Sequence, residues 1–132
     1  MATSSARDRR DEARRAAALA VIQKRFREPQ CSVSSVAEEL HLSVRQLYRS
    51  FVGHESPSEI ISRVRTSAAI TLLLNDRGLP APEVARRAGF VDPGTMREHL
   101  RRLLGMGSRE IRSQCVKLSE LTRRSPPAQV SE

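Results

Sequence analysis

Apolar residues recur every three or four positions along most of the chain, which is the spacing of one face of an α-helix. Leu19, Ile22 and Phe26 form one such stripe, and Pro29 ends it, because proline interrupts a helix. This stripe predicts a first helix over about residues 9–27. The whole pattern predicts an all-α fold of seven helices with no strand.

Capping residues mark where the other helices begin. At such a position, a serine hydroxyl or an aspartate carboxylate accepts a hydrogen bond from an unpaired backbone N–H group of the first turn. Residues 56–59 combine a capping box with proline at the first helical position, and they start a long helix that reaches about residue 75. A last helix is expected to run toward Leu121. The expected starts are Ser32, Ser43, Ser56, Ala81, Asp92 and Ser108.

Two of these helices are short and have a narrow apolar face that is expected to point into the core. The residues of these faces are Val44, Leu47 and Phe51 in the third helix and Met96, Leu100 and Leu103 in the sixth.

The segment at residues 36–42 returns 48 residues later at residues 84–90, and each copy is followed by a polar turn and another helical pattern. Each copy has the form of a helix-turn-helix with an alanine at the helix contact. Gly89 allows the turn to leave right-handed helical space, and His41 takes the matching place in the first copy. Two such units in register in a basic chain indicate binding to DNA.

The expected elements divide the chain into five parts. Residues 1–8 are a disordered basic N-terminus, residues 9–55 the first helix-turn-helix subdomain and residues 56–76 a linker helix. Residues 77–121 form the second subdomain, and residues 122–132 a disordered tail.

The charge of the chain indicates a polyanionic partner. Lys and Arg total 23 against 15 Asp and Glu among 132 residues, and residues 84–124 alone hold ten bases and four acids. Nearly all the cations are Arg, whose planar guanidinium suits phosphates and base edges. A basic surface kept for solubility is the alternative, but the size of the excess favours a nucleic acid.

Other classes of function have little support in the sequence. Cys31 and Cys115 have no metal-ligand spacing with the histidines, so we expect neither a metal nor a cofactor. No catalytic constellation is present, and the chain is not expected to be an enzyme. It has no apolar run long enough for a membrane span and no signal sequence, so a cytoplasmic protein is expected.

Four segments resemble the DNA-binding domain of the AraC/XylS family of bacterial transcription regulators. Residues 32–51 look like its first helix-turn-helix, and residues 84–93 are similar to its second. Arg65, Ala69 and Leu73 follow its linker-helix pattern, and residues 105–112 follow its closing motif. The resemblance covers about residues 15–113 and implies two homeodomain-like helix-turn-helix subdomains joined by a rigid linker helix. This chain would be a stand-alone DNA-binding domain, either a complete small regulator or part of a longer one.

The same resemblance implies how DNA is bound. One monomer would place two recognition helices in successive major grooves of an asymmetric site of about 20 base pairs. The chain would act on transcription as an activator, with RNA polymerase as a second partner, in the bacterial cytoplasm on the nucleoid.

Base contacts are expected from the outward faces of the two recognition helices. An arginine there can bind guanine, and glutamine can bind adenine. Glu98 stands where the family commonly has Arg. It is expected to accept from a cytosine amino group or to orient a neighbouring Arg, and the alternative is a surface pair with Arg101 or Arg102. The candidates for base contact are Arg45, Gln46, Tyr48, Arg49, Thr95, Arg97, Glu98 and His99.

Phosphate contacts position a protein on DNA without selecting a sequence. The candidates are Ser32, Ser43, Arg86, Arg87, Arg101, Arg102, Arg109 and Arg112. The first unit is thus expected to contribute more of the base selection and the second more of the affinity.

Two alternatives to a regulator remain. A basic helical interaction module, such as an adaptor held on RNA polymerase, would contact DNA weakly or not at all. A nonspecific nucleic-acid chaperone would bind with a strong salt dependence but without a sequence motif.

Overall fold

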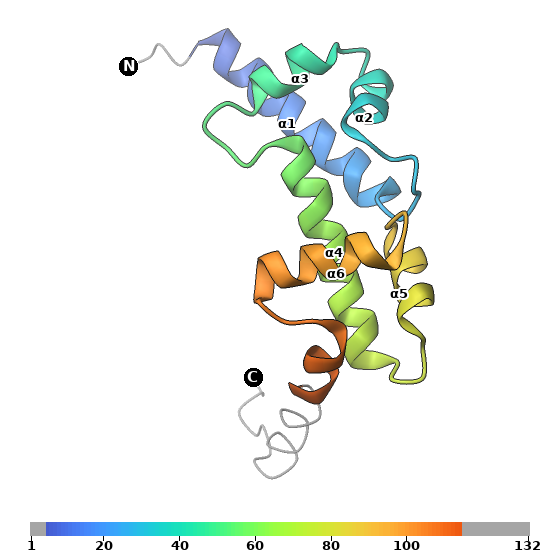
Figure 1. Ribbon diagram of the computed structural model, residues 1–132. Coiled ribbons are helices and arrows are strands. Elements are labelled where there is room, and N and C mark those ends of the chain that lie inside the picture. The colour runs from blue at the N-terminus through green and yellow to red at the C-terminus, as the bar shows by residue number, and fades with distance from the viewer. Residues whose placement is uncertain (1–4, 115–132) are drawn as a thin grey trace, which may run out of the picture.

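The computed structural model describes residues 5–114 and contains helices and no strand in that range (Figure 1). A seventh helical segment begins at Ser108 and continues to Gln114, the last described residue. The all-α prediction with seven helices is therefore confirmed. The six complete helices are α1 (Ala6–Arg25), α2 (Val33–Glu39), α3 (Val44–Ser50), α4 (Pro57–Asn75), α5 (Ala81–Ala88) and α6 (Pro93–Leu104).

The first helix begins before the expected place. Residues 6–8, predicted to be disordered, form the first turn of α1. Asp8 lies in this turn, where its negative charge suits the positive end of the helix dipole. The predicted disorder of residues 1–4 and 122–132, and the end of the last helix near Leu121, lie outside the described residues.

Four of the five predicted caps are present, and the cap predicted at Ser108 is not, because Ser108 is the first helical residue and Gly107 precedes it. The Oγ atoms of Ser32, Ser43 and Ser56 accept from backbone N–H groups three residues later, at 3.2, 3.0 and 3.3 Å, and each belongs to a capping box. Such a serine cap stabilises a helix by about 1 kcal/mol. The carboxylate of Asp92 accepts from the Thr95 N–H at 2.7 Å, which holds the pKa of Asp92 below its usual range.

Two apolar cores lie along α4, which runs through the length of the molecule (Figure 1). Helices α1, α2 and α3 gather around its N-terminal part, with Ile22 and Leu47 fully buried. Helices α5 and α6 pack around its C-terminal part, with Met96 and Leu100 fully buried. The two cores are contiguous because Ala68 packs against both.

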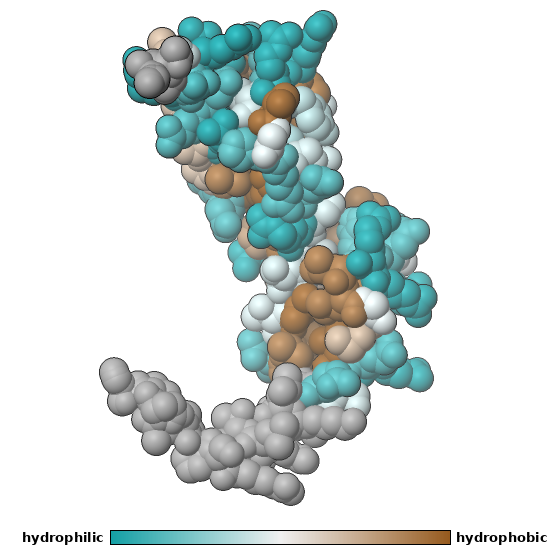
Figure 2. All heavy atoms as spheres, turned by 90° about the vertical axis from the view of Figure 1, so that its left-hand side faces the viewer, coloured by the Kyte–Doolittle hydropathy of each residue, from teal (hydrophilic) through white to brown (hydrophobic). Residues whose placement is uncertain are grey.

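Three residues of the predicted apolar faces are exposed. Leu19 of α1 is 41 % exposed, whereas Ile22 and Phe26 of the same stripe are buried. Val44 is 39 % exposed, because the buried face of α3 passes through Leu47, Ser50 and Phe51 and leaves the first residue at its edge. Leu103 is 51 % exposed in the last turn of α6, where it borders an open groove against α4. Together with Leu104, which is 40 % exposed, it belongs to the second subdomain, over which Figure 2 shows an apolar patch.

Both helix-turn-helix turns contain a residue with positive φ, as expected. His41 has φ 59° and Gly89 has φ 96°. The second turn is confined more tightly, since a Cβ atom on Gly89 would lie 2.2 Å from the carbonyl oxygen of Phe26. The turn of the second unit therefore rests against the end of α1.

Arg65 in α4 joins the same region. Its guanidinium donates to the backbone carbonyls of Phe26, Glu28 and Cys31 at 2.8, 3.0 and 2.9 Å. Its Nε also lies 2.9 Å from where a Cβ of residue 89 would stand. The linker helix, the α1–α2 connection and the second turn thus meet at Arg65, and we call this contact the joint.

Candidate nucleic-acid interface

The outward face of α3 presents two arginines. Arg45 and Arg49 are exposed, lie one helical turn apart, and within residues 5–114 neither guanidinium is bonded to a protein group. They are free to contact guanine, whose N7 and O6 atoms accept two hydrogen bonds from one arginine.

The opposite side of α3 is held by α1. Ser50 is buried there, and its hydroxyl donates to the Gln46 carbonyl at 3.1 Å and to the Asp11 carboxylate at 3.3 Å. Arg15 donates to the Ser50 carbonyl at 2.9 Å. These contacts orient the recognition helix. They were not predicted, because a serine between apolar residues has no distinctive signal in the sequence.

Gln46 is already engaged in the cap of α3. Its Oε1 atom accepts from the Ser43 backbone N–H at 2.9 Å, while the backbone N–H of Gln46 donates to Ser43 Oγ. Binding adenine through two hydrogen bonds requires the same Oε1 atom and the amide nitrogen. The predicted adenine contact of Gln46 would therefore compete with the capping box.

Val44 and Tyr48 form a small apolar area beside Arg45 on the surface of α3. Each is 39 % exposed, and they lie four residues apart on one side of the helix. Exposed apolar side chains on a recognition helix can contact thymine methyl groups. Tyr48 was predicted to contact DNA, whereas Val44 was missed because the apolar spacing assigned it to the core.

Arg97, Glu98 and Arg101 are exposed on the outward face of α6. Glu98 makes no ion pair with Arg101 or Arg102 in the described part of the chain, so the surface-pair interpretation of this residue has no support. Thr95 is half-buried beside the Asp92 cap.

His99 does not point outward with these residues. Its ring lies 5.4 Å from that of Phe90 between centroids, and its Nδ1 atom is buried without a hydrogen-bond partner. Burial, and then the charge of Arg102, lower the pKa of His99. The geometry thus favours a neutral, packed histidine and argues against its predicted base contact.

His99 and Arg102 border a groove of about 450 Å³ between α6 and the N-terminal half of α4. From α4, Ser58, Ser62 and Thr66 line this groove. Arg102 remains exposed at its edge and can still reach a phosphate.

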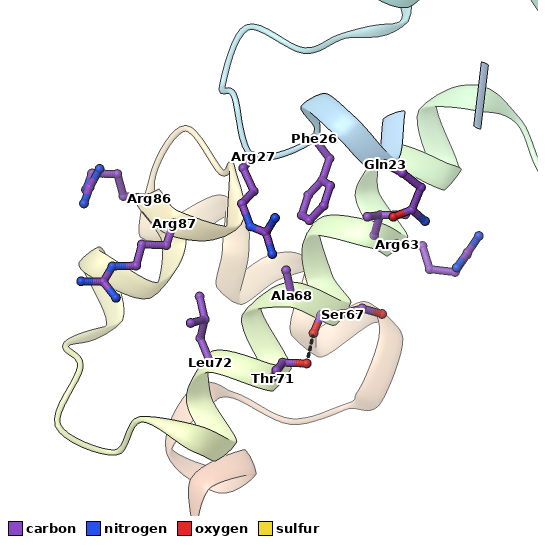
Figure 3. Close-up of a pocket in the computed structure, with 11 residues that line it drawn as sticks. Gln23, Phe26, Arg27, Arg63, Ser67, Ala68, Thr71, Leu72, Arg86 and Arg87 are labelled. Atoms are coloured by element: carbon purple, nitrogen blue, oxygen red, sulfur yellow. Dashed lines mark hydrogen bonds between the residues drawn. The ribbon is translucent and has the colours of Figure 1, made fainter. Parts of the chain in front are cut away.

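Arg86 and Arg87 lie at a second groove, of about 810 Å³, formed by α1, α4 and α5 (Figure 3). Its α4 residues include Val64, Ser67 and Thr71, which lie on the side of α4 opposite to the residues that face α6. This position argues against the predicted phosphate contacts of Arg86 and Arg87, because it turns them away from the recognition helix of their own unit.

Glu83 binds both of these arginines. Arg86 Nε donates to one carboxylate oxygen at 3.0 Å and Arg87 Nε to the other at 2.9 Å. The hydrogen bond from Arg86, followed by that from Arg87, is the main cause that lowers the pKa of Glu83 to about 2. The carboxylate is therefore ionised at neutral pH and offsets part of the arginine charge.

The other phosphate candidates divide into free and engaged groups. Arg101, Arg102 and Arg109 are exposed. Arg112 is half-buried and donates to the Leu79 carbonyl, which ties the last helix to the α4–α5 connection and argues against a phosphate contact.

The hydroxyls of Ser32 and Ser43 serve as helix caps at the N-termini of α2 and α3. Both serines are exposed, so a phosphate could still approach the helix ends that they cap.

In the described residues, no group of three or more His, Cys, Asp or Glu side chains is arranged to hold a metal ion. None of the described helices has the length and apolar character needed to cross a membrane.

Comparison with known families matches residues 36–114 to the model of a helix-turn-helix domain, which covers both units and the linker between them. No match was found among the curated proteins.

Several solved structures are similar. The DNA-binding domain of AdpA, described as a global transcriptional factor and solved with a target DNA, is 28 % identical with a TM-score of 0.66, over 84 % of this chain and 95 % of that one. The C-terminal domain of the response regulator AraT from Geobacillus stearothermophilus is 27 % identical with a TM-score of 0.66, over 86 % and 88 %. An AraC-type transcriptional regulator from Chromobacterium violaceum has the same fold, at 22 % identity and a TM-score of 0.68, over 79 % and 93 %.

Proposed function

The chain belongs to the AraC/XylS family of helix-turn-helix transcription regulators, and we propose that one monomer binds an asymmetric DNA site of about 20 base pairs. Helices α3 and α6 would enter successive major grooves. The observation that carries this proposal is the joint, where Arg65 and Gly89 bring the α1–α2 connection of the first unit, the linker helix and the turn of the second unit into contact. A rigid spacing between two recognition helices is what a two-groove site requires.

The proposed base contacts follow from exposure. Arg45 and Arg49 of α3 and Arg97 of α6 would bind guanines, while Val44 and Tyr48 would contact thymine methyl groups. Glu98, exposed and without an ion pair in residues 5–114, would accept from a cytosine amino group. The proposed phosphate contacts are Ser32, Ser43, Arg101, Arg102 and Arg109.

A selection from random DNA tests the function directly. We expect enrichment of one asymmetric motif spanning about 20 base pairs, with an affinity that falls steeply as salt is raised. Footprinting on the selected site should show two protected major grooves. A footprint limited to about ten base pairs would contradict binding through both units, and the absence of any motif would favour the adaptor or the nonspecific chaperone.

Arg49→Ala is expected to weaken binding to the selected site by roughly 1–3 kcal/mol and to relax base preference at one position. The reason is that the exposed Arg49 guanidinium has no other partner in the described residues. Affinities for the parent site and its single-base variants measure both effects.

Arg101→Ala, by contrast, should lower affinity for all sequences alike. Arg87→Ala should leave affinity unchanged, because Arg87 lies at the groove of Figure 3. Equal effects of all three changes would refute the assignment of contacts.

The proposed mode of action is activation of transcription in the bacterial cytoplasm, with RNA polymerase as the second partner and without a catalytic role. It rests on the family resemblance. A reporter promoter with the selected site placed upstream distinguishes activation from repression.

A further inference from the structure

The first turns of α1 carry five arginines and three acidic residues within residues 7–15. Arg7, Arg10 and Arg14 follow one another at spacings of three and four residues, so they share one side of the helix. Asp8 and Glu12, four residues apart, share another side. Asp11 lies on the same side between Arg7 and Arg14, but its carboxylate accepts from Ser50 of α3, so the three guanidiniums form a row beside one engaged carboxylate. We call Arg7, Arg10 and Arg14 the α1 stripe.

The stripe is available to a ligand. Arg7 and Arg10 are exposed and Arg14 is half-buried, and none of the three forms an ion pair with a carboxylate in residues 5–114. Figure 2 shows hydrophilic side chains over this end of the molecule. The three positive charges are therefore uncompensated by direct contact.

The orientation of the stripe follows from the contacts of α1 with α3. Asp11 bonds to the buried Ser50 of the recognition helix. Arg7 lies four residues before Asp11 and Arg14 three residues after it, so both flank the side of α1 that faces α3. Arg10 directly precedes Asp11 and lies about a quarter turn farther from α3. Arg9, two residues before Asp11, points to the opposite side.

DNA bound by α3 would lie on this same side of α1. Ser50 is on the back of α3, and the exposed Arg45 and Arg49 are on its front, so α3 stands between α1 and the floor of the major groove. The groove is about 8.5 Å deep and about 12 Å wide, and its phosphate strands therefore rise beside a helix that rests on its floor. The first turns of α1 extend past the C-terminal end of α3 (Figure 1). A phosphate strand that flanks α3 at this end would pass beside them.

We propose that Arg7, Arg10 and Arg14 form a third DNA contact, which binds the phosphates flanking the first major groove. This inference rests on the proposed function, because it places DNA against α3. Phosphates carry no base information, so the stripe adds affinity without changing the motif. It also adds cationic phosphate contacts to the first unit, whose other proposed phosphate contacts are the hydroxyls of Ser32 and Ser43.

The test compares two variants that lose equal charge. In R7A/R10A/R14A, the slope of log affinity against log salt should become shallower by about 0.9 for each phosphate contact removed, and affinity at low salt should fall at least about tenfold. The control R9A/R86A/R87A changes arginines that point away from DNA, and its slope should match the parent. The selected motif should be the same for all three proteins. Thermal unfolding verifies that each variant folds.

Conservative replacement separates charge from structure. R7K/R10K/R14K should retain most of the salt slope, since lysine also neutralises phosphates. The inference is overturned if R7A/R10A/R14A keeps the parental salt slope. It is also overturned if the control loses as much slope as the stripe variant, because the effect would then come from the overall positive charge of the protein. The salt slopes of the same variants are also measured on a duplex of random sequence, which tests the stripe without a selected motif. If the selection yields no motif, that result refutes the proposed function and not the stripe.

Discussion

Gly89→Ala is expected to destabilise the protein by about 3 kcal/mol and to abolish binding to the two-groove site. Two costs add at this position. The left-handed φ of 96° is unfavourable for alanine, and the new Cβ would lie 2.2 Å from the Phe26 carbonyl oxygen and 2.9 Å from Arg65 Nε. Residue 89 would have to move away from Phe26 and Arg65 to make room for the Cβ atom.

Gly53→Ala is the matched control. Gly53 also has a left-handed φ, 87°, but a Cβ there meets no atom within 4 Å. This variant carries only the backbone cost, roughly 1–2 kcal/mol. Urea unfolding of both variants measures the difference, and equal losses would show that contact with α1 adds nothing at Gly89.

Arg65→Met is expected to cost about 2–3 kcal/mol of stability and to loosen the spacing between the two DNA half-sites. Methionine keeps much of the length of the side chain but removes the donors to three backbone carbonyls of the α1–α2 connection. Without them the two units are held chiefly by packing. Selection with a library of half-site spacings should therefore enrich several spacings for the variant and one for the parent.

Arg63→Met provides the comparison on the same helix. Arg63 is half-exposed and pairs with Glu55 at 3.0 Å on the surface, an interaction worth less than about 1 kcal/mol. Its loss should leave spacing preference intact. If Arg65→Met also retained a single spacing, the packing of Gly89 on α1 would be sufficient to set the geometry.

Signals within a few residues of each other predicted the helices well. The serine caps, the proline at the start of α4 and the glycine at residue 89 act through their own turn of backbone, so their effect is readable without a tertiary structure. The start of α1 was placed late because the first turn has no side-chain cap and the charged residues there have no apolar spacing.

The candidate site was predicted less completely, because the direction of a charged side chain depends on what packs against it. Arg49 and Arg87 are both arginines on short helices, yet one is free and the other is bound to Glu83 at a groove away from α6. His99 packs against Phe90 of the preceding turn, and Arg112 bonds to Leu79, which is 33 residues away in the sequence. Composition gives the net charge of the surface, but only the fold shows in which direction each charged side chain points.

The joint also explains why two copies of one motif have diverged at their turns. Residue 41 and residue 89 occupy equivalent places, and both adopt positive φ. His41 is exposed, so its side chain has room, while residue 89 lies against the end of α1 and has none. The two turns are therefore under different steric constraints. The first is free to drift among residues that tolerate a left-handed backbone, and the second is restricted to glycine for as long as the two units touch.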